Sequence, residues 1–166
     1  MSQELIDYSR KALIFAVQLL GNQSDAEDVV QASVEKALAH PKAPKGGIDL
    51  QKWLYRVVRN AAIDRIRQLS REDELDTEQQ STSSQSPEMQ LEQLQIKTRL
   101  MQALSALPVM QRELIVLRDY HGNSYEDIAE ILAIPTGTVM SRLHRARMAL
   151  RELLKHELNE VNHESV

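Results

Sequence analysis

The segment from residue 138 to residue 147 carries side chains that could form hydrogen bonds with nucleic acid. A guanidinium group can donate two hydrogen bonds to one guanine, and a serine or threonine hydroxyl can bond bases or phosphates. If the segment is helical, the side opposite its apolar residues presents Thr138, Ser141, Arg142, His144, Arg145 and Arg147. We therefore predict that this side enters the major groove of duplex DNA. The alternative is a helical hairpin whose charged side is simply solvated.

A second group of polar side chains belongs to a helix predicted over residues 50–69. The cations and amide that lie off its apolar stripe are Arg56, Arg59, Asn60, Arg65 and Arg67, and Lys42, Lys45 and Lys52 lie at or before its start. Such a row of cations could follow a phosphate backbone, and the amide of Asn60 could read a base edge. Trp53 could stack on an unpaired base, but one Trp on an apolar helix face usually belongs to the core, and we assign it there.

Acidic residues begin the helix predicted before this one. Asp25, Glu27 and Asp28 occupy its first turns, and Gln31 and Glu35 follow. Negative charge at a helix N-terminus is favourable because of the helix dipole, which is a sufficient structural reason for at least two of these acids. A surface for docking another protein is the more specific alternative.

Enzymatic chemistry has no sequence support. There is no glycine-rich phosphate loop and no nucleophile motif, and the five histidines show no paired metal-ligand spacing. The chain has no cysteine, so disulfides and thiolate metal sites are excluded. We expect no catalytic residue, metal, cofactor or small-molecule substrate.

Helical periodicity predicts the elements that position these groups. In the first part of the chain, apolar residues recur at helical spacing over 5–19, 26–38 and 53–61, with a loop at 41–49. Ser24 and Glu27 match a capping box and predict the start of the second helix. In the last third, Pro108 suits the first turn of a helix that runs through Asp119.

The C-terminal part has the organisation of a helix-turn-helix. Ser124 is expected to cap a short helix over 125–132, and a tight connection over 133–137 contains Gly137. A long final helix follows, with an apolar seam at Val139, Leu143 and Ala146 that continues to residue 153. In this motif the second helix presents its first turns to the major groove.

An acidic polar segment separates the two parts. The formal net charge of −4 divides into +2 over residues 1–68, −6 over 69–95 and 0 over 96–166. The middle segment is rich in Ser, Thr and Gln and poor in large apolar residues, which is typical of a flexible linker. The sequence therefore predicts an all-α fold with domains at 1–69 and 91–166, joined by a linker at 70–90. The polar N-terminus and the absence of a long apolar run lead us to expect a cytoplasmic protein.

Two motifs resemble a known family, the extracytoplasmic function (ECF) sigma factors of the sigma-70 family. The first motif comprises AEDVVQ at 26–31 and WLYRVVRNAAID at 53–64, which look like region 2. The second comprises YEDIAEIL at 125–132 and PTGTVMSRLHRAR at 135–147, which look like region 4. The match covers nearly all of the chain outside the linker and the termini.

The resemblance implies a function and partners. Proteins of this family direct RNA polymerase to promoters: region 2 contacts the clamp helices and melts the −10 element, while region 4 reads the −35 duplex and contacts the flap. By position, the polymerase-binding residues would be Asp25, Asp28, Gln31 and Glu35. The unpaired −10 strand would contact the loop at 41–49 and Arg56, Arg59, Asn60, Asp64 and Arg67. Ser141 and Arg145 would read the −35 groove. An anti-sigma factor, in this family often bound to the inner membrane, is a further expected partner.

Departures from the family pattern concern promoter choice. Met140 stands where the family often has Lys or Arg, and Val34 where an aromatic is common. Two other functions remain open from the residues alone. A stand-alone helix-turn-helix regulator would leave the segment from Trp53 to Asp64 unexplained, and a protein-binding helical adaptor would not depend on Arg145.

Overall fold

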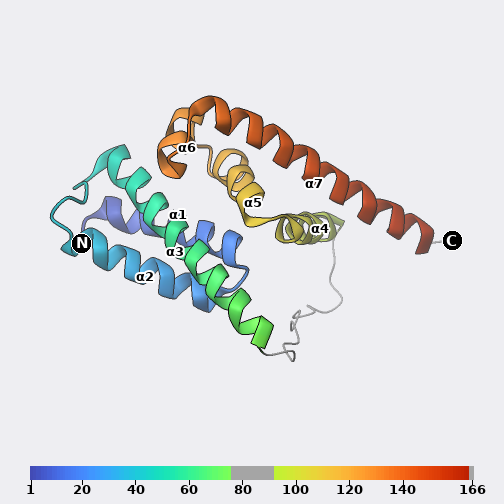
Figure 1. The fold of residues 1–166 in the computed structure, drawn as a ribbon, viewed down its shortest axis with the longest axis horizontal. Helices are drawn as coiled ribbons and strands as arrows, with labels where there is room; N and C mark the ends of the chain where they lie inside the picture. Colours follow the sequence, from blue (N-terminus) through green and yellow to red (C-terminus); the bar gives the residue numbers. More distant parts are fainter. Residues whose placement is uncertain (76–91, 165–166) are drawn as a thin grey trace.

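Two groups of helices make up the fold of the computed structural model, which describes residues 1–75 and 92–164. α1 (Gln3–Leu20), α2 (Gln23–Ala39) and α3 (Gly47–Leu75) form the N-terminal half (Figure 1). The C-terminal half contains α4 (Glu92–Ala106), α5 (Val109–Ile115), the π-helical turn η1 (Val116–Tyr120), α6 (Tyr125–Leu132) and α7 (Thr136–Glu164). The predicted all-α fold is confirmed. None of the helices in the described ranges has the length and apolarity needed to span a membrane.

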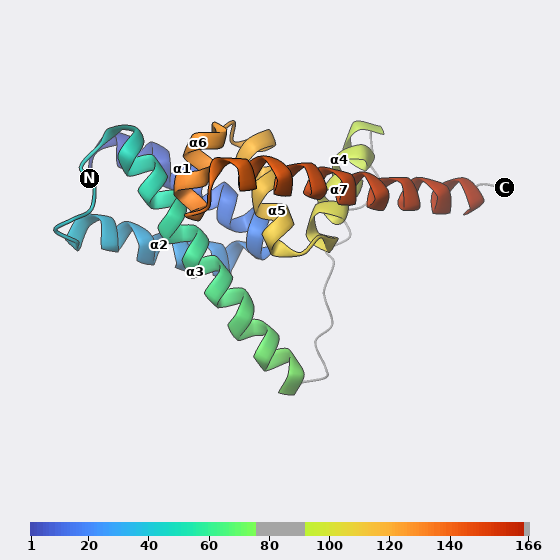
Figure 2. The same ribbon diagram turned by 45° about the horizontal axis from the view of Figure 1, so that its top comes forward.

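The two halves pack against each other. Phe15, Leu54 and Val58 from the N-terminal half belong to the same cluster of buried residues as Leu117 and Ile128 from the C-terminal half. Figure 2 shows the last turns of α3 and of α7 projecting away from this junction in different directions. The apolar stripe predicted on α3 faces the core, and Trp53 packs against it without being fully buried.

The boundaries of α2 and α3 differ from the prediction. The N-cap of α2 is Asn22, whose Oδ1 accepts a hydrogen bond from the backbone N–H of Asp25 at 2.9 Å, so the capping box predicted at Ser24 and Glu27 is wrong. α3 begins at Gly47 and ends at Leu75, which makes residues 70–75 helical rather than linker. These residues contain good helix formers and neither Gly nor Pro, so the helix continues past the core. The rest of the predicted linker, 76–90, lies outside the described residues.

A π-helical turn interrupts the helix that was predicted to run to residue 119. The N–H of His121 donates to the carbonyl of Val116 at 2.9 Å, a spacing of five residues. Gly122 then takes a left-handed φ of 72°, and the side chain of Asn123 donates to the carbonyl of Leu117 at 3.0 Å. The turn brings Asp119 beside α7 and His121 beside α1 and α3.

The connection between α6 and α7 places a non-glycine residue in a left-handed conformation. Ser124 caps α6 as predicted, accepting from the N–H of Asp127 at 3.1 Å. α6 ends at Leu132; its C-cap Ala133 has φ 56° and ψ 48°, and the N–H of Ile134 closes the turn on the carbonyl of Ala129. Gly137, expected in the connection, lies in the first turn of α7 and does not have a positive φ.

Substitution of Ala133 by Gly is expected to stabilise the protein by about 0.5–1 kcal/mol. A Cβ in the left-handed region costs ~1–2 kcal/mol, and the greater freedom of Gly in the unfolded chain offsets part of the gain. Thermal unfolding followed by circular dichroism should show a rise in Tm of about 2–4 °C. The matched control is Ala32→Gly, at an exposed position inside α2, which should lower stability by ~1 kcal/mol. If Ala133→Gly and Ala32→Gly changed the stability equally, the left-handed conformation of Ala133 would not be a source of strain.

Candidate nucleic-acid interface

The first turns of α7 present an exposed polar face. Val139, Leu143 and Ala146 are buried and hold this helix against α5 and α6. The opposite side carries the predicted DNA-reading residues. Met140, Ser141, Arg142, His144 and Arg145 are exposed, while Thr138 and Arg147 are half-buried. Because the turn after α6 is short, this face lies where a helix-turn-helix presents side chains to a groove.

Two members of this set have side chains that form hydrogen bonds within the described residues: Ser141 Oγ donates to the carbonyl of Thr138 at 3.2 Å, and Arg147 pairs with an acid. Its guanidinium forms two bonds to Asp119 in η1, Nε to Oδ2 at 3.1 Å and a terminal nitrogen to Oδ1 at 2.6 Å. The hydrogen bond to Asp119 raises the pKa of Arg147, so the charge is fixed. This pair joins η1 to α7, which gives Arg147 a structural role beside any contact with DNA.

The predicted −10 residues on α3 fall into two groups. Arg56, Asn60, Asp64 and Arg67 are exposed along one side of the helix. Arg59 instead points to the C-terminal half, where its Nε donates to Oε2 of Glu113 at 2.7 Å and a terminal nitrogen donates to Oε1 at 3.1 Å. Its remaining nitrogen donates to the side-chain oxygen of Asn60 at 3.2 Å.

Glu113 is an acid inside the junction between the halves. It is 2% exposed. Burial raises the pKa of its carboxyl, while Arg59 and, more weakly, Arg142 oppose that shift. Sequence patterns did not single out Glu113, because a Glu in a helix is ordinarily solvated.

The predicted polymerase-binding acids on α2 are also split. Asp28, Gln31 and Glu35 are exposed at positions that share one side of the helix. Asp25 is half-buried and accepts a hydrogen bond from Arg65 of α3 at 3.2 Å. Asp25 therefore helps to join α2 to α3, and three of the four predicted groups are left on the open surface.

The sequence patterns did not predict a cluster of aromatic and polar side chains at the junction. The Nδ1 atom of His121 is hydrogen-bonded to the hydroxyl of Tyr55 at 2.9 Å, and its Nε2 atom is hydrogen-bonded to Oε1 of Gln18 at 2.9 Å. Because the Gln18 oxygen only accepts, Nε2 carries the proton and Tyr55 donates to Nδ1. Burial raises the pKa of Tyr55 to about 12, while burial and the charge of Lys11 lower the pKa of His121 to about 4. Both groups are therefore neutral at pH 7.

Two further cations join the halves. Lys52 on α3 pairs with Glu130 and, at 3.8 Å, with Asp127 on α6. Arg112 on α5 donates to the carbonyl of Leu19 at 2.8 Å, which is one of the last carbonyls of α1 and has no partner within that helix. The sequence feature that could have indicated this junction is Tyr55. It extends the apolar stripe of α3 to the side of the helix that carries Lys52 and Arg59.

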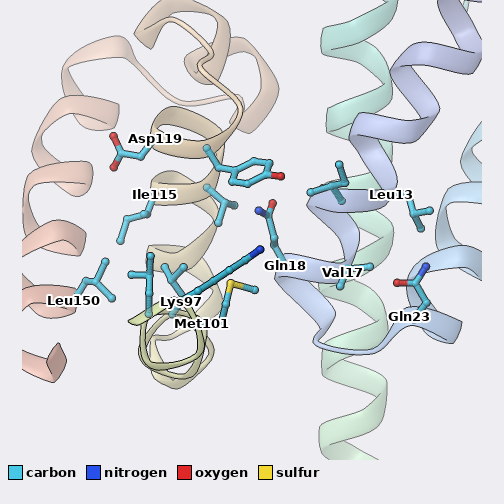
Figure 3. A pocket seen from close by; sticks show the side chains of 14 residues that line it. Leu13, Val17, Gln18, Gln23, Lys97, Met101, Ile115, Asp119 and Leu150 are labelled. Carbon is cyan, nitrogen blue, oxygen red and sulfur yellow. The ribbon is translucent and has the colours of Figure 1, made fainter. Parts of the chain in front are cut away.

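A largely apolar groove opens beside this junction. Its volume is about 610 Å³, and its walls come from α1, α4, α5, η1 and α7, with Gln23 of α2 at one side. Figure 3 shows Val17 and Gln18 on one wall and Met101 and Ile115 on the other. Ile14, Leu100, Met101 and Tyr120, all exposed, also line it. The polar side chains of Gln18, Gln23, Lys97 and Asp119 also line it, but most of the lining is apolar, which suits apolar side chains of a protein partner.

Comparison with known proteins places both halves in one family. The family model described as Sigma-70 region 2 matches residues 5–72, and the model for Sigma-70, region 4 matches residues 97–150. The ECF RNA polymerase sigma factor SigW of Bacillus subtilis is 32% identical over 92% of this chain and 88% of its own length. EcfG of Rhodopseudomonas palustris is 36% identical over 84% of this chain and 77% of its own.

A solved structure has the same fold. The sigma factor RpoE from Bartonella quintana, solved in complex with the anti-sigma factor NepR, superposes with a TM-score of 0.70 and is 32% identical. The alignment covers 92% of this chain and 95% of that protein. The helix-turn-helix, the order of the two halves and these relatives all indicate the same family. The chain belongs to the ECF sigma factors of the sigma-70 family, non-enzymatic subunits that direct RNA polymerase to initiate transcription.

Proposed function

We propose that the two halves of this sigma factor recognise different parts of a promoter. The C-terminal half reads the −35 duplex with the exposed face of α7, where Ser141 and Arg145 contact base edges and Thr138, Arg142 and His144 contact bases or phosphates nearby. The observation that carries this proposal is the division of α7 into a buried apolar seam and an exposed polar face in its first turns. A helix anchored in this way can hold its donors in register with a groove.

The N-terminal half contacts the unpaired −10 strand through the exposed side of α3. Arg56 and Arg67 neutralise phosphates, while Asn60 and Asp64 offer hydrogen-bonding groups to unstacked bases. The predicted loop at 41–49 is shorter in the structure because α3 begins at Gly47; residues 41–46 precede α3 and contribute Lys42 and Lys45, both exposed. Trp53 is not assigned a stacking role because it packs against the core.

Two protein partners complete this proposal. The exposed side of α2 formed by Asp28, Gln31 and Glu35 contacts the polymerase clamp helices, and the C-terminal half contacts the flap. An anti-sigma factor holds the protein inactive in the cytoplasm, free or at the inner membrane, by analogy with the relative solved with NepR. We place its contact at the apolar groove, because exposed apolar residues from both halves gather there.

Replacing Arg145 by Ala is expected to weaken binding to the −35 element roughly tenfold to a hundredfold, which corresponds to ~1–3 kcal/mol for a bidentate contact with a base. The loss should appear as weaker discrimination between the preferred −35 sequence and substituted ones. Reconstituted polymerase holoenzyme, tested for transcript initiation on a promoter selected from genomic DNA, provides the measurement.

The matched control is Arg151→Ala, which removes an exposed cation from the same helix beyond the proposed reading face. This change should leave sequence discrimination intact and reduce only salt-dependent affinity. Equal discrimination by the two variants would contradict −35 reading by Arg145. Failure of the wild-type protein to support transcripts with core polymerase would contradict the function as a whole.

A further inference from the structure

One side of α3 is bonded to the C-terminal half from Lys52 to Arg59. Lys52, Tyr55 and Arg59 lie three and four residues apart, so they share a side of the helix. Their partners are Glu130 and Asp127 of α6, His121 after η1, and Glu113 of α5. Figures 1 and 2 both show α6 beside the first turns of α3. The junction therefore uses cations of the N-terminal half and acids of the C-terminal half.

Arg59 makes the most complete of these contacts. Two of its nitrogens bond the two oxygens of Glu113, the fork geometry in which a guanidinium also binds a phosphate. The side chain of Arg59 is 17% exposed and that of Glu113 is 3% exposed. A phosphate could not bind the same two donors of Arg59 while this pair is formed, because the carboxylate occupies Nε and one terminal nitrogen.

We propose that Glu113 acts as an internal substitute for a DNA phosphate and holds the free protein in a closed conformation that masks Arg59 from the promoter strand. The inference rests on the proposed −10 role of α3 and includes Arg59 in it, as the resemblance of the segment at 53–64 implies. Opening exchanges the Glu113 carboxylate for a phosphate at the same guanidinium, and the released carboxylate becomes hydrated. The closed and open conformations then differ by a small free energy, as a reversible switch requires.

The masking is selective. The reading face of α7 stays exposed in the closed conformation, whereas Arg59 is covered and its neighbour Asn60 accepts a hydrogen bond from it. Ion pairs and hydrogen bonds flank the apolar cluster that the two halves share, and these polar contacts can be exchanged for contacts with another partner. Free protein should therefore be able to reach duplex DNA through α7 while α3 remains unable to capture a single strand through Arg59.

The opening is measured by fluorescence energy transfer between the halves. The chain has no cysteine, so Lys36→Cys in α2 and Met148→Cys in α7, both exposed, give two unique labelling sites. Glu113→Gln should lower the transfer efficiency of the free full-length protein, because a neutral amide loses the ion pair. Glu126→Gln removes an exposed acid of α6 and should leave the transfer unchanged. Unchanged transfer in Glu113→Gln would overturn the proposal.

Exchanging the charges of residues 59 and 113 distinguishes opening of the junction from unfolding of the protein. Far-UV circular dichroism checks separately that each variant is folded. Arg59→Glu alone should open the protein, and the double variant Arg59→Glu with Glu113→Arg should close it again. Restored transfer in the double variant supports a specific pair. An open double variant shows that the pair does not hold the halves together and counts against the proposal.

The masking is measured with fluorescein-labelled, random-sequence single-stranded DNA at fixed low salt. If a tenth of the molecules are open, full opening by Glu113→Gln should raise the affinity about tenfold. The gain should disappear when Arg59→Ala is added. The masking would be overturned if the affinity gain of Glu113→Gln persisted in the presence of Arg59→Ala. It would also be overturned if Glu113→Gln opened the protein without raising the affinity.

The underlying −10 role is tested separately. Arg59→Ala in the holoenzyme, on a promoter with a premelted −10 element, should reduce initiation. If Arg59→Ala initiates normally on this promoter while Glu113→Gln still lowers the energy transfer, the proposed −10 role of Arg59 is wrong but the opening of the junction stands.

Discussion

Replacing Phe15 with Ala is expected to lower the free energy of unfolding by about 3–5 kcal/mol, the range for deleting a buried aromatic ring. Phe15 is completely buried in α1. Its ring packs edge-on against Tyr55 at a centroid distance of 5.4 Å and against His121 at 5.7 Å. Each aromatic contact adds ~0.5–1.5 kcal/mol to the burial of the ring. Because Tyr55 and His121 come from different halves, the cavity would weaken the N-terminal core and the junction together.

The adjacent residue provides the control for this prediction. Ile14 is 41% exposed, and Ile14→Ala should change stability by no more than about 0.5–1 kcal/mol. Urea unfolding followed by circular dichroism measures both variants. A loss below about 1 kcal/mol for Phe15→Ala would contradict the aromatic packing, and two separate transitions in the wild-type protein would contradict a shared core.

The helices were predictable because each buries a periodic stripe, whereas their ends depended on finer geometry. Asn22 and Ser24 both have side chains that can cap a helix, so local chemistry did not choose between them. The choice follows from the preceding turn: Gly21 takes a left-handed φ of 69°, which leaves Asn22 extended and its side chain over the first turn of α2. Similarly, nothing in the sequence marked Ala133 rather than Gly137 as the left-handed residue.

The exposed face of α7 was predictable for a related reason. The seam at Val139, Leu143 and Ala146 fixes which side is buried, so the opposite side follows from helical geometry. Pairings between distant residues have no such local signal. Arg59 meets Glu113 across 54 positions and Arg65 meets Asp25 across 40, and both depend on how the helices pack. The sequence therefore predicted which groups are cationic but not which of them already have a partner.

His121 is the residue whose role changed most between sequence and structure. By spacing it was one of five scattered histidines, yet it lies in the junction between Tyr55, Gln18 and Phe15. Its position depends on the π-helical turn, which hydrophobic periodicity does not predict. Its neutral imidazole accepts from the buried Tyr55 and donates to the half-buried Gln18, so adding a proton disturbs both the charge and the bonding of the junction.

Acidification from pH 7 to pH 4 is therefore expected to destabilise the protein through His121. Burial, and then the charge of Lys11, lower the pKa of this ring from 6.5 to about 4 in the folded protein. Between these values the unfolded chain binds a proton that the folded protein does not, so stability decreases as the pH falls. The contribution is complete above pH 6.5 and is lost as the pH approaches 4. It amounts to at most about 3 kcal/mol, reduced by screening because the ring is only partly buried.

His121→Gln isolates this contribution from the other titrating groups. The carboxylates, Tyr55, Tyr120 and Lys11 remain in both proteins, so their effects cancel in the difference between the two unfolding free energies. That difference should shrink steadily from pH 6.5 to pH 4, because only the wild-type protein loses stability by charging this ring. A difference independent of pH would mean that the imidazole titrates equally in the folded and unfolded chains. NMR titration of the ring protons checks the cause directly, since a folded-state pKa near 6.5 would remove the basis of the effect.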